Sequence, residues 1–242
     1  MSVRDLEAEH RDLPGRRYAY EFDYILRDYL LRALEPHLAR GRAPELGCYK
    51  GEFTKLLLER HESVTVVEGS KELMEAARMA TNGRGRFIQA FFEDVMLEEQ
   101  FDAIYLVHTL EHLDDPQRVL RRVRGWLADA GRLFLVVPNA NAASRQVAVG
   151  MGLISHNAAV TEGERAHGHR RTYSLDTLEY EVRAAGLSVH ARGGVLFKPL
   201  ANFQIDRALE AGIIDSAYLD GCYRLGALYP DLCASIYLVC RK

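Results

Sequence analysis

The hydrophobic positions of this chain follow two alternating periods over most of its length. Compact β-branched or apolar runs, such as 63–67 and 101–107, predict buried strands. Segments with apolar residues three or four positions apart, such as 52–60 and 116–127, predict amphipathic helices. Further strands are predicted at 85–90, 132–137, 187–193 and 235–240, and further helices at 69–79, 175–185, 204–211 and 215–228. Strands that alternate with helices of this length predict βαβ units, and therefore an α/β fold with a parallel sheet.

Residues 1–40 are predicted to form a helical cap that precedes the sheet. Apolar positions along 5–40 recur with the spacing of an amphipathic helix, and Pro14-Gly15 is expected to separate a first short helix from a second one. Tyr18 and Tyr20 belong to an aromatic cluster with two interpretations. Their rings pack in the core, or they form a lid whose faces and hydroxyls contact a bound molecule.

The alternation of strands and helices stops between residues 139 and 173, within a main domain predicted to span 41–242. This stretch is rich in polar and small residues and follows directly on a predicted strand. Ligands of open parallel sheets bind at the carboxyl ends of the strands, so an insertion here is well placed to cover a substrate. The alternative interpretation is a plain surface loop.

Composition narrows the class of protein. With 242 residues, 48% hydrophobic and 27% charged, the chain has the make-up of one large globular domain. Its net charge of -3 gives no indication of bulk nucleic-acid binding. The charged N-terminus argues against a signal peptide, and the apolar run 133–137 is too short to span a membrane. The four cysteines lack metal-site spacing, so we expect free thiols and a cytoplasmic protein.

The stretch 44–53, which ends a short predicted strand and begins a helix, is the best candidate for a ligand site. It contains Gly47 and Gly51, and glycine lets a backbone turn sharply or approach a bound molecule closely. Taken alone, this spacing also fits an unliganded turn. Glu68, at the end of the next strand, is 21 residues beyond Gly47 (68 − 47), where a carboxylate can accept hydrogen bonds from ribose hydroxyls. The turn lacks the Gly-x-Gly-x-x-Gly of a dinucleotide site, which disfavours NAD.

Six segments in order carry a resemblance to a known family. They are Glu45-Leu46-Gly47-Cys48-Tyr49-Lys50-Gly51, the strand-terminal Glu68, Phe92-Glu93-Asp94, Phe101-Asp102-Ala103-Ile104, His108-Thr109-Leu110-Glu111-His112-Leu113-Asp114-Asp115-Pro116, and Gly131-Arg132-Leu133 with Val137-Pro138-Asn139. Across residues 43–140 the chain resembles the class I S-adenosylmethionine-dependent methyltransferases. The resemblance implies a doubly wound, mostly parallel seven-stranded sheet with a C-terminal antiparallel hairpin. Tyr49 stands where the family usually has glycine.

The resemblance also implies which residues bind S-adenosyl-L-methionine, whose product is S-adenosyl-L-homocysteine. Gly47 and Gly51 would contact the methionine part, and Glu68 would bind the ribose. Phe92 and Glu93 would flank the adenine, although core packing and a solvated charge are their respective alternatives. His108 would face the methionine amino group and the transferring methyl. Glu45 and Tyr49 complete the expected cofactor set.

The methyl acceptor is expected to meet histidines of the insertion. His167 and His169 are the candidate catalytic bases for a hydroxyl acceptor, because histidine titrates near neutral pH. Two alternatives are that they have no role, or that they bind a metal with Glu164, although no metal is expected. The remaining candidate substrate contacts are Tyr18, Tyr20, His112, Arg170 and Lys198.

The sequence therefore predicts a small-molecule methyltransferase with an oxygen acceptor favoured over nitrogen. A natural product, a sugar or a sugar-linked carrier is the expected substrate, and the protein is expected to be a monomer or homodimer without nucleic-acid or membrane partners. One alternative is a non-catalytic module that binds S-adenosylmethionine. An NAD-dependent reductase is the other.

Overall fold

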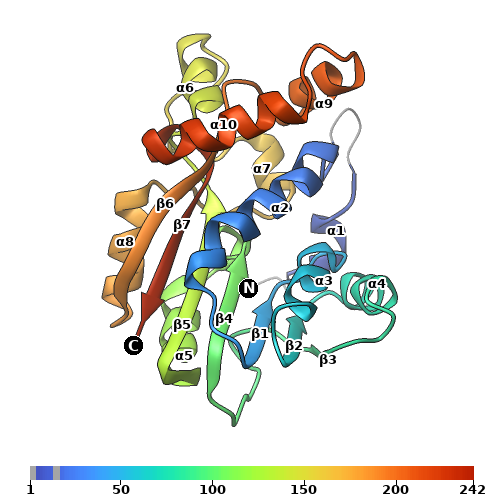
Figure 1. Ribbon diagram of the computed structural model, residues 1–242, viewed down its shortest axis with the longest axis vertical. Coiled ribbons are helices and arrows are strands. Elements are labelled where there is room, and N and C mark those ends of the chain that lie inside the picture. Colours follow the sequence, from blue (N-terminus) through green and yellow to red (C-terminus); the bar gives the residue numbers. More distant parts are fainter. Residues whose placement is uncertain (1–3, 13–16) are drawn as a thin grey trace.

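A seven-stranded sheet forms the centre of the computed structural model, which describes residues 4–12 and 17–242 (Figure 1). The strands are β1 (Arg42–Leu46), β2 (Ser63–Glu68), β3 (Arg86–Gln89), β4 (Phe101–Val107), β5 (Leu127–Pro138), β6 (Ser188–Phe197) and β7 (Cys233–Arg241). Their order across the sheet is β3-β2-β1-β4-β5-β7-β6. The first five strands pair in parallel, and β7 lies antiparallel to both β5 and β6. The predicted mostly parallel α/β sheet with a C-terminal antiparallel hairpin is thus confirmed.

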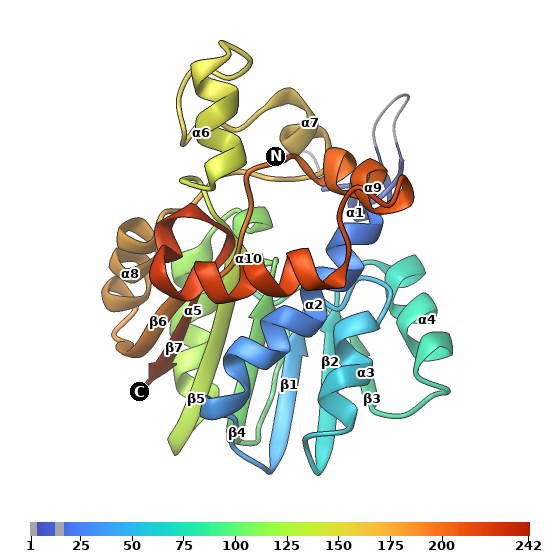
Figure 2. The same cartoon turned by 45° about the horizontal axis from the view of Figure 1, so that its top comes forward.

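Helices cover both faces of this sheet (Figure 2). They are α1 (Leu6–Glu9), α2 (Glu21–Leu34), α3 (Glu52–Leu58), α4 (Lys71–Ala80), α5 (Pro116–Trp126), α6 (Ala143–Gly150), α7 (Glu162–Ala166), α8 (Leu175–Ala184), α9 (Asn202–Glu210) and α10 (Ser216–Leu228). Short 3-10 turns occur at η1 (Glu35–His37), η2 (Leu110–His112) and η3 (Pro230–Leu232). Within the described residues, none of the helices combines the length and the apolar character that crossing a bilayer requires.

The central strands are buried on both sides because their side chains alternate between two cores. On β5, Leu133, Leu135 and Val137 pack with α5 and α8 on one face. Phe134 and Val136 point the other way and pack with α2, α3 and α10. All five side chains are fully buried, which explains why this strand is a continuous hydrophobic run in the sequence.

The N-terminal part of the chain forms two helices, α1 and α2, as predicted, and a 3-10 turn follows them. Pro14-Gly15, the expected separator of these helices, lies outside the described residues. The strand predicted at 187–193 extends further, because Gly193 and Gly194 both pair with β7 inside β6. The turn η2 follows β4, and α5 begins at Pro116, as the sequence predicts. Asp115 caps α5 by accepting from Arg118 N at 2.9 Å, which fixes that start.

The insertion between β5 and α8 is folded and contains α6 and α7. Arg145 on α6 pairs with Glu164 on α7, with 2.6 Å between Nη1 and Oε1. The same guanidinium donates to the carbonyl oxygens of Asn157 and Ala159. One half-buried arginine therefore joins three parts of the insertion, which lies above the sheet in Figure 2.

We predict that Tyr105→Phe lowers the free energy of unfolding by about 1–3 kcal/mol, because it leaves a buried histidine without its partner. The Tyr105 hydroxyl lies 2.8 Å from His61 Nε2, and both side chains are buried. Urea unfolding followed by circular dichroism measures the change. Tyr180→Phe is the matched control, because Tyr180 is 74% exposed. Equal stability of the two variants would contradict the prediction.

Candidate functional site

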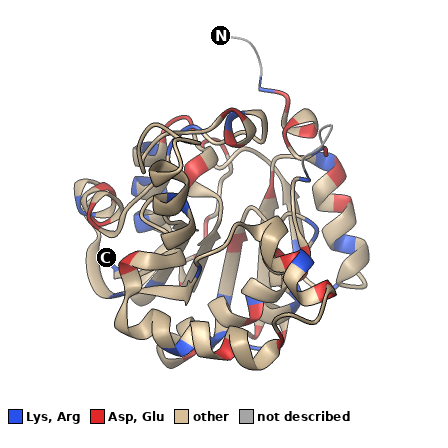
Figure 3. Ribbon diagram, turned by 90° about the horizontal axis from the view of Figure 1, so that it is seen from above, with Lys and Arg blue, Asp and Glu red and all other residues tan. Residues whose placement is uncertain are grey.

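A cavity of about 770 Å³ opens at the edge of the sheet where β1, β2, β4 and β5 end. Figure 3 looks down on this edge, and it shows acidic and basic residues interspersed over the described ribbon. The cavity is lined by the turns after these strands, the N-terminal segment, η2, the insertion and the start of α9. Its volume falls in the range of about 300–1,000 Å³ typical of small-molecule sites.

Glu68 joins the two turns that form the first wall of the cavity. One carboxylate oxygen accepts from the Cys48 N–H at 3.1 Å, and the other accepts from the Ser70 N–H at 2.9 Å. Burial raises the pKa of this carboxyl group, while the N–H donors act in the opposite direction. A carboxylate has about four lone-pair sites, so acceptor capacity remains for ribose hydroxyls.

The two glycines of the first turn have different tasks. Gly47 lines the cavity with φ at 83°, and a Cβ there would lie 2.5 Å from Thr109 Oγ1. Gly51 begins α3 with φ at 85°, and a Cβ there would lie 2.8 Å from the Ala77 backbone. Gly51 is not among the residues that line the cavity. Its lack of a side chain instead allows α3 and α4 to pack closely.

Tyr49 adopts the left-handed backbone conformation that a glycine would take at this position, with φ at 48°. Its ring stacks on that of Tyr18, with centroids 5.1 Å apart and planes at 22°. Tyr18 in turn packs edge-on against His167, with ring centroids 5.2 Å apart. These three rings line the cavity, so the substitution of the usual glycine adds an aromatic wall to the turn.

Glu45 is buried beneath the same turn and also lines the cavity. Thr54 Oγ1 of α3 donates to its carboxylate at 2.5 Å. Burial raises the pKa of Glu45 to about 8. Its hydrogen bond holds α3 against the end of β1.

The expected adenine end is formed by the loop after β3. Phe92 and Glu93 line the cavity there together with Phe91. The loop backbone is held from α5, where Arg122 Nε donates to the Phe92 carbonyl at 3.1 Å and Arg118 donates to the Glu93 carbonyl at 3.2 Å.

His108 closes the cavity at the end of β4. Its Nε2 lies 2.9 Å from Ser235 Oγ on β7, and its φ is 50°. Burial lowers the pKa of His108 to about 3, so the ring is neutral near pH 7. A neutral imidazole is compatible with the positively charged sulfonium that this wall is expected to face.

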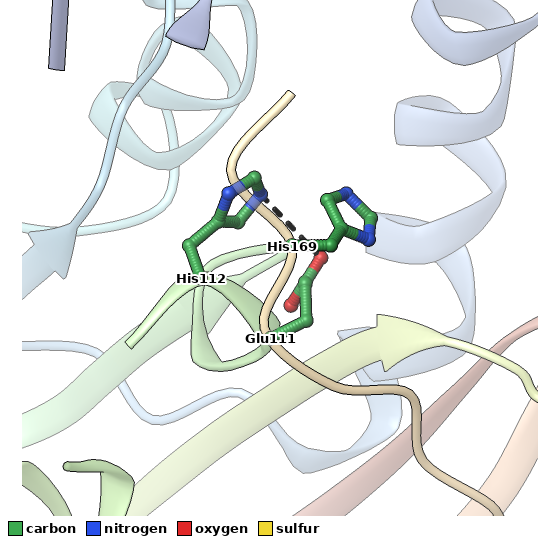
Figure 4. Close-up of side chains that lie close together, drawn as sticks. All are labelled: Glu111, His112 and His169. Carbon is green, nitrogen blue, oxygen red and sulfur yellow. Dashed lines mark ion pairs between the residues drawn. The ribbon is translucent and has the colours of Figure 1, made fainter. Parts of the chain in front are cut away.

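Three side chains from two distant segments meet where η2 and the insertion line the cavity, at the expected acceptor end (Figure 4). Glu111 and His112 come from η2, and His169 comes from the insertion. The His112 and His169 rings have centroids 4.6 Å apart, and His112 Nε2 lies 4.0 Å from the Glu111 carboxylate. Burial lowers the pKa of His112 and lowers that of His169 to about 4, so both rings are neutral.

Two of the three remaining candidate substrate residues line the cavity, and one does not. Tyr20 lines the cavity beside the start of α2, and so does Lys198, whose Nζ lies 2.5 Å from Asn202 Oδ1. Arg170 lies outside the lining, where it pairs with Glu9 and Asp114 at 3.1 Å each. Its guanidinium therefore fastens the insertion to two other segments.

Several residues that line the cavity were not among the predicted site residues, for example Asn139, Arg145 and Ser235. Asn139 belongs to the Val137-Pro138-Asn139 motif, which predicted the end of a strand but no contact with a ligand. Arg145 and Ser235 lie in segments without any motif, and only the folding of the insertion and of β7 brings them to the cavity.

The N-terminal segment closes over the cofactor wall. Glu7 of α1 accepts hydrogen bonds from Ser70 Oγ at 2.7 Å and from the Lys71 N–H at 2.8 Å. These donors stand at the N-terminus of α4, where a carboxylate is favourable. Leu6 and Glu9 from the same helix line the cavity.

A methyltransferase-domain family model matches residues 17–192, so the chain belongs to this family. The fold and the carboxylate at the end of β2 agree with a class I S-adenosylmethionine-dependent methyltransferase. The buried Glu68 carboxylate and the cavity beside it fit a nucleoside with a free ribose. The enzyme class and its cofactor, S-adenosyl-L-methionine, predicted from the sequence, are thereby confirmed.

Relatives of similar length carry the name ubiquinone biosynthesis O-methyltransferase. The one from Xanthomonas axonopodis pv. citri is 28% identical over 182 residues, 72% of this chain and 73% of its own. The one from Aeromonas salmonicida is 27% identical over 168 residues, 66% of this chain and 68% of its own.

Solved structures show the same fold. The N-methyltransferase NodS from Bradyrhizobium japonicum, in complex with S-adenosyl-L-homocysteine, has a TM-score of 0.60 at 17% identity and covers 98% of this chain and 96% of its own. A possible histamine N-methyltransferase from Thermotoga maritima has a TM-score of 0.63 at 18% identity, covering 92% and 93%.

We predict that Glu68→Ala weakens S-adenosylmethionine binding roughly 10- to 100-fold, because charge-assisted hydrogen bonds contribute about 1.5–3 kcal/mol. Isothermal titration calorimetry measures the affinity. Glu62→Ala, an exposed position just before β2, is the control and should bind like the wild type. Unchanged affinity in a folded Glu68→Ala variant would show that Glu68 does not bind the cofactor.

Proposed function

We propose that the chain methylates a hydroxyl group of a small molecule. The observation that carries this proposal is the group of neutral histidines, His112 and His169, that lines the same cavity as the expected nucleoside wall. Neutral imidazoles can receive a proton, which an oxygen acceptor has to lose. The names of the O-methyltransferase relatives support the same chemistry.

The cofactor supplies an electrophilic methyl group on a sulfonium. The acceptor oxygen forms a bond to the methyl carbon as the carbon–sulfur bond breaks, and that electron pair stays on the sulfur of the leaving thioether. The hydroxyl proton goes to a histidine nitrogen. The main task of the protein is therefore to hold the acceptor oxygen in line and to take up this proton.

His167 is best placed to receive the proton. Its Nδ1 lies 3.4 Å from the Glu9 carbonyl oxygen, which can only accept, so Nδ1 carries the hydrogen. Its Nε2 is buried and has no hydrogen-bond partner among the described residues. The ring is held edge-on by Tyr18. We assign Nε2 of His167 as the base and His169 as an acceptor contact.

We also propose that residues 1–40 and 139–173 act as two covers over the 41–242 domain. The first rests on the cofactor side through Glu7, and the second reaches the acceptor side through His167 and His169. Arg170 connects them, because it pairs with Glu9 of the first cover. A small molecule enclosed by both covers is shielded from water during transfer.

We predict that His167→Ala and His169→Ala each lower turnover by about 100-fold or more, the range of general acid–base catalysis, with nearly unchanged cofactor affinity. The assay measures S-adenosylhomocysteine release with panels of hydroxylated and aminated small molecules. His190→Ala, on β6 away from the cavity, is the control. Full activity of both variants would refute the base assignment.

The acceptor panel also tests the reaction class. Turnover on amines alone would show that the methyl acceptor is nitrogen and not oxygen. Cofactor binding without turnover on any acceptor would favour a non-catalytic binding module.

A further inference from the structure

We propose that Glu111, His112 and His169 bind a divalent transition-metal ion at the acceptor end of the cavity. This inference rests on the proposed O-methylation and adds to it that the ion binds the hydroxyl group that receives the methyl group. The substrate class is then a small molecule with a second oxygen donor beside the reacting hydroxyl.

The three side chains have the geometry of an open site. One ligand atom from each lies within 4.8 Å of the other two. Ligands around a zinc-sized ion are about 2.0–2.2 Å from the metal, so modest rotation of these side chains brings the three atoms into one coordination sphere. All three residues line the cavity, so an ion held between them lies beside the space where an acceptor can bind.

The Glu111 carboxylate gives an independent indication of a missing partner. Glu111 is 1% exposed, and neither carboxylate oxygen has a hydrogen-bond partner among the residues that the structure describes. The other two buried glutamates behave differently, because Glu45 accepts from Thr54 and Glu68 accepts from two backbone N–H groups. An unpaired buried carboxyl group is unfavourable, whereas a bound cation stabilises it.

The ligand types of the cluster indicate which ions it prefers. Two imidazoles and one carboxylate suit zinc, manganese, iron or cobalt better than calcium or magnesium, which prefer oxygen ligands.

The backbone holds the two ligand segments together. The Arg170 N–H donates to the Glu111 carbonyl at 2.8 Å, which joins the insertion directly to η2. Gly168 has φ at 84°, and a Cβ there would lie 3.2 Å from His112 Nδ1 and 2.2 Å from a Glu9 carboxylate oxygen. Glycine at this position therefore allows the chain carrying His169 to approach His112.

A metal at this place has a direct use in the transfer. An acceptor hydroxyl bound to the ion loses its proton more readily, and the proton goes to His167 Nε2. The oxygen keeps the electron pair that then forms the bond to the methyl carbon. A second oxygen of the acceptor on the same ion fixes the orientation of the reacting one.

Titration with Co²⁺ tests the site in the full-length protein after chelator treatment and dialysis. We expect one ion per chain with visible absorption bands, confirmed by elemental analysis. Glu111→Gln and His169→Ala should each weaken this binding about 100-fold or more, since loss even of an outer-shell partner costs about 10- to 100-fold. Circular dichroism verifies that each variant is folded.

Two matched histidine variants complete the experiment. His167→Ala removes a neighbouring cavity histidine outside the cluster and should keep the ion. His10→Ala removes the centre of a second group of metal-type residues, Glu7, His10 and Glu72, and should also leave the assigned site intact. Loss of the ion in His10→Ala, with retention in Glu111→Gln, would show that the ion binds at the second group, and it would overturn the proposal.

The outcomes separate the metal site from the proposed function. Absence of stoichiometric Co²⁺ binding, or equal binding in Glu111→Gln and His169→Ala, overturns the metal site. Turnover that is unchanged by chelator overturns the role of the ion while the methyltransferase activity stands. Stoichiometric binding lost in both variants, without turnover on any hydroxyl acceptor, supports the site and refutes the proposed O-methylation.

Discussion

The Glu68 carboxylate is the interaction on which the rest of the site depends. It accepts from the backbone N–H of Cys48 and from that of Ser70, so it ties the turn after β1 to the turn after β2. A buried carboxylate needs such donors, and parallel pairing of β1 with β2 brings both turns to it. The carboxylate that we expect to bind the ribose therefore also shapes the cavity wall.

The fold was predictable because its signals are local. β-branched runs and helical periodicity predict most of the sheet, and the continuous apolar runs of β4 and β5 reflect burial on both faces. The ends of the strands were less predictable, because pairing with a distant strand sets them. Pairing with β7 extends β6 beyond the predicted end at residue 193, to Phe197. Pairing of Leu127 with Phe101 of β4 begins β5 before the predicted start at residue 132.

The acceptor end was only partly predictable, because its contacts join segments far apart in the sequence. His167 and His169 were candidates by residue type, whereas their surroundings depend on the Arg145–Glu164 pair and on a backbone hydrogen bond to Glu111. Sequence spacing suggested Glu164 as the partner of these histidines. Glu164 instead pairs with Arg145, and Glu111 is the carboxylate that lies beside His169.

The two ends of the cavity differ in how completely their polar groups are satisfied. At the cofactor end, Glu45 and Glu68 have donors from the protein itself, so this wall is rigid before any ligand binds. At the acceptor end, the Glu111 oxygens and His167 Nε2 are buried without partners among the described residues. Unsatisfied buried groups destabilise a fold, and a structure retains them where binding supplies what is missing. Tyr49 is also locally unfavourable, since its left-handed backbone costs about 1–3 kcal/mol, and in return its ring stacks on Tyr18, which packs against His167.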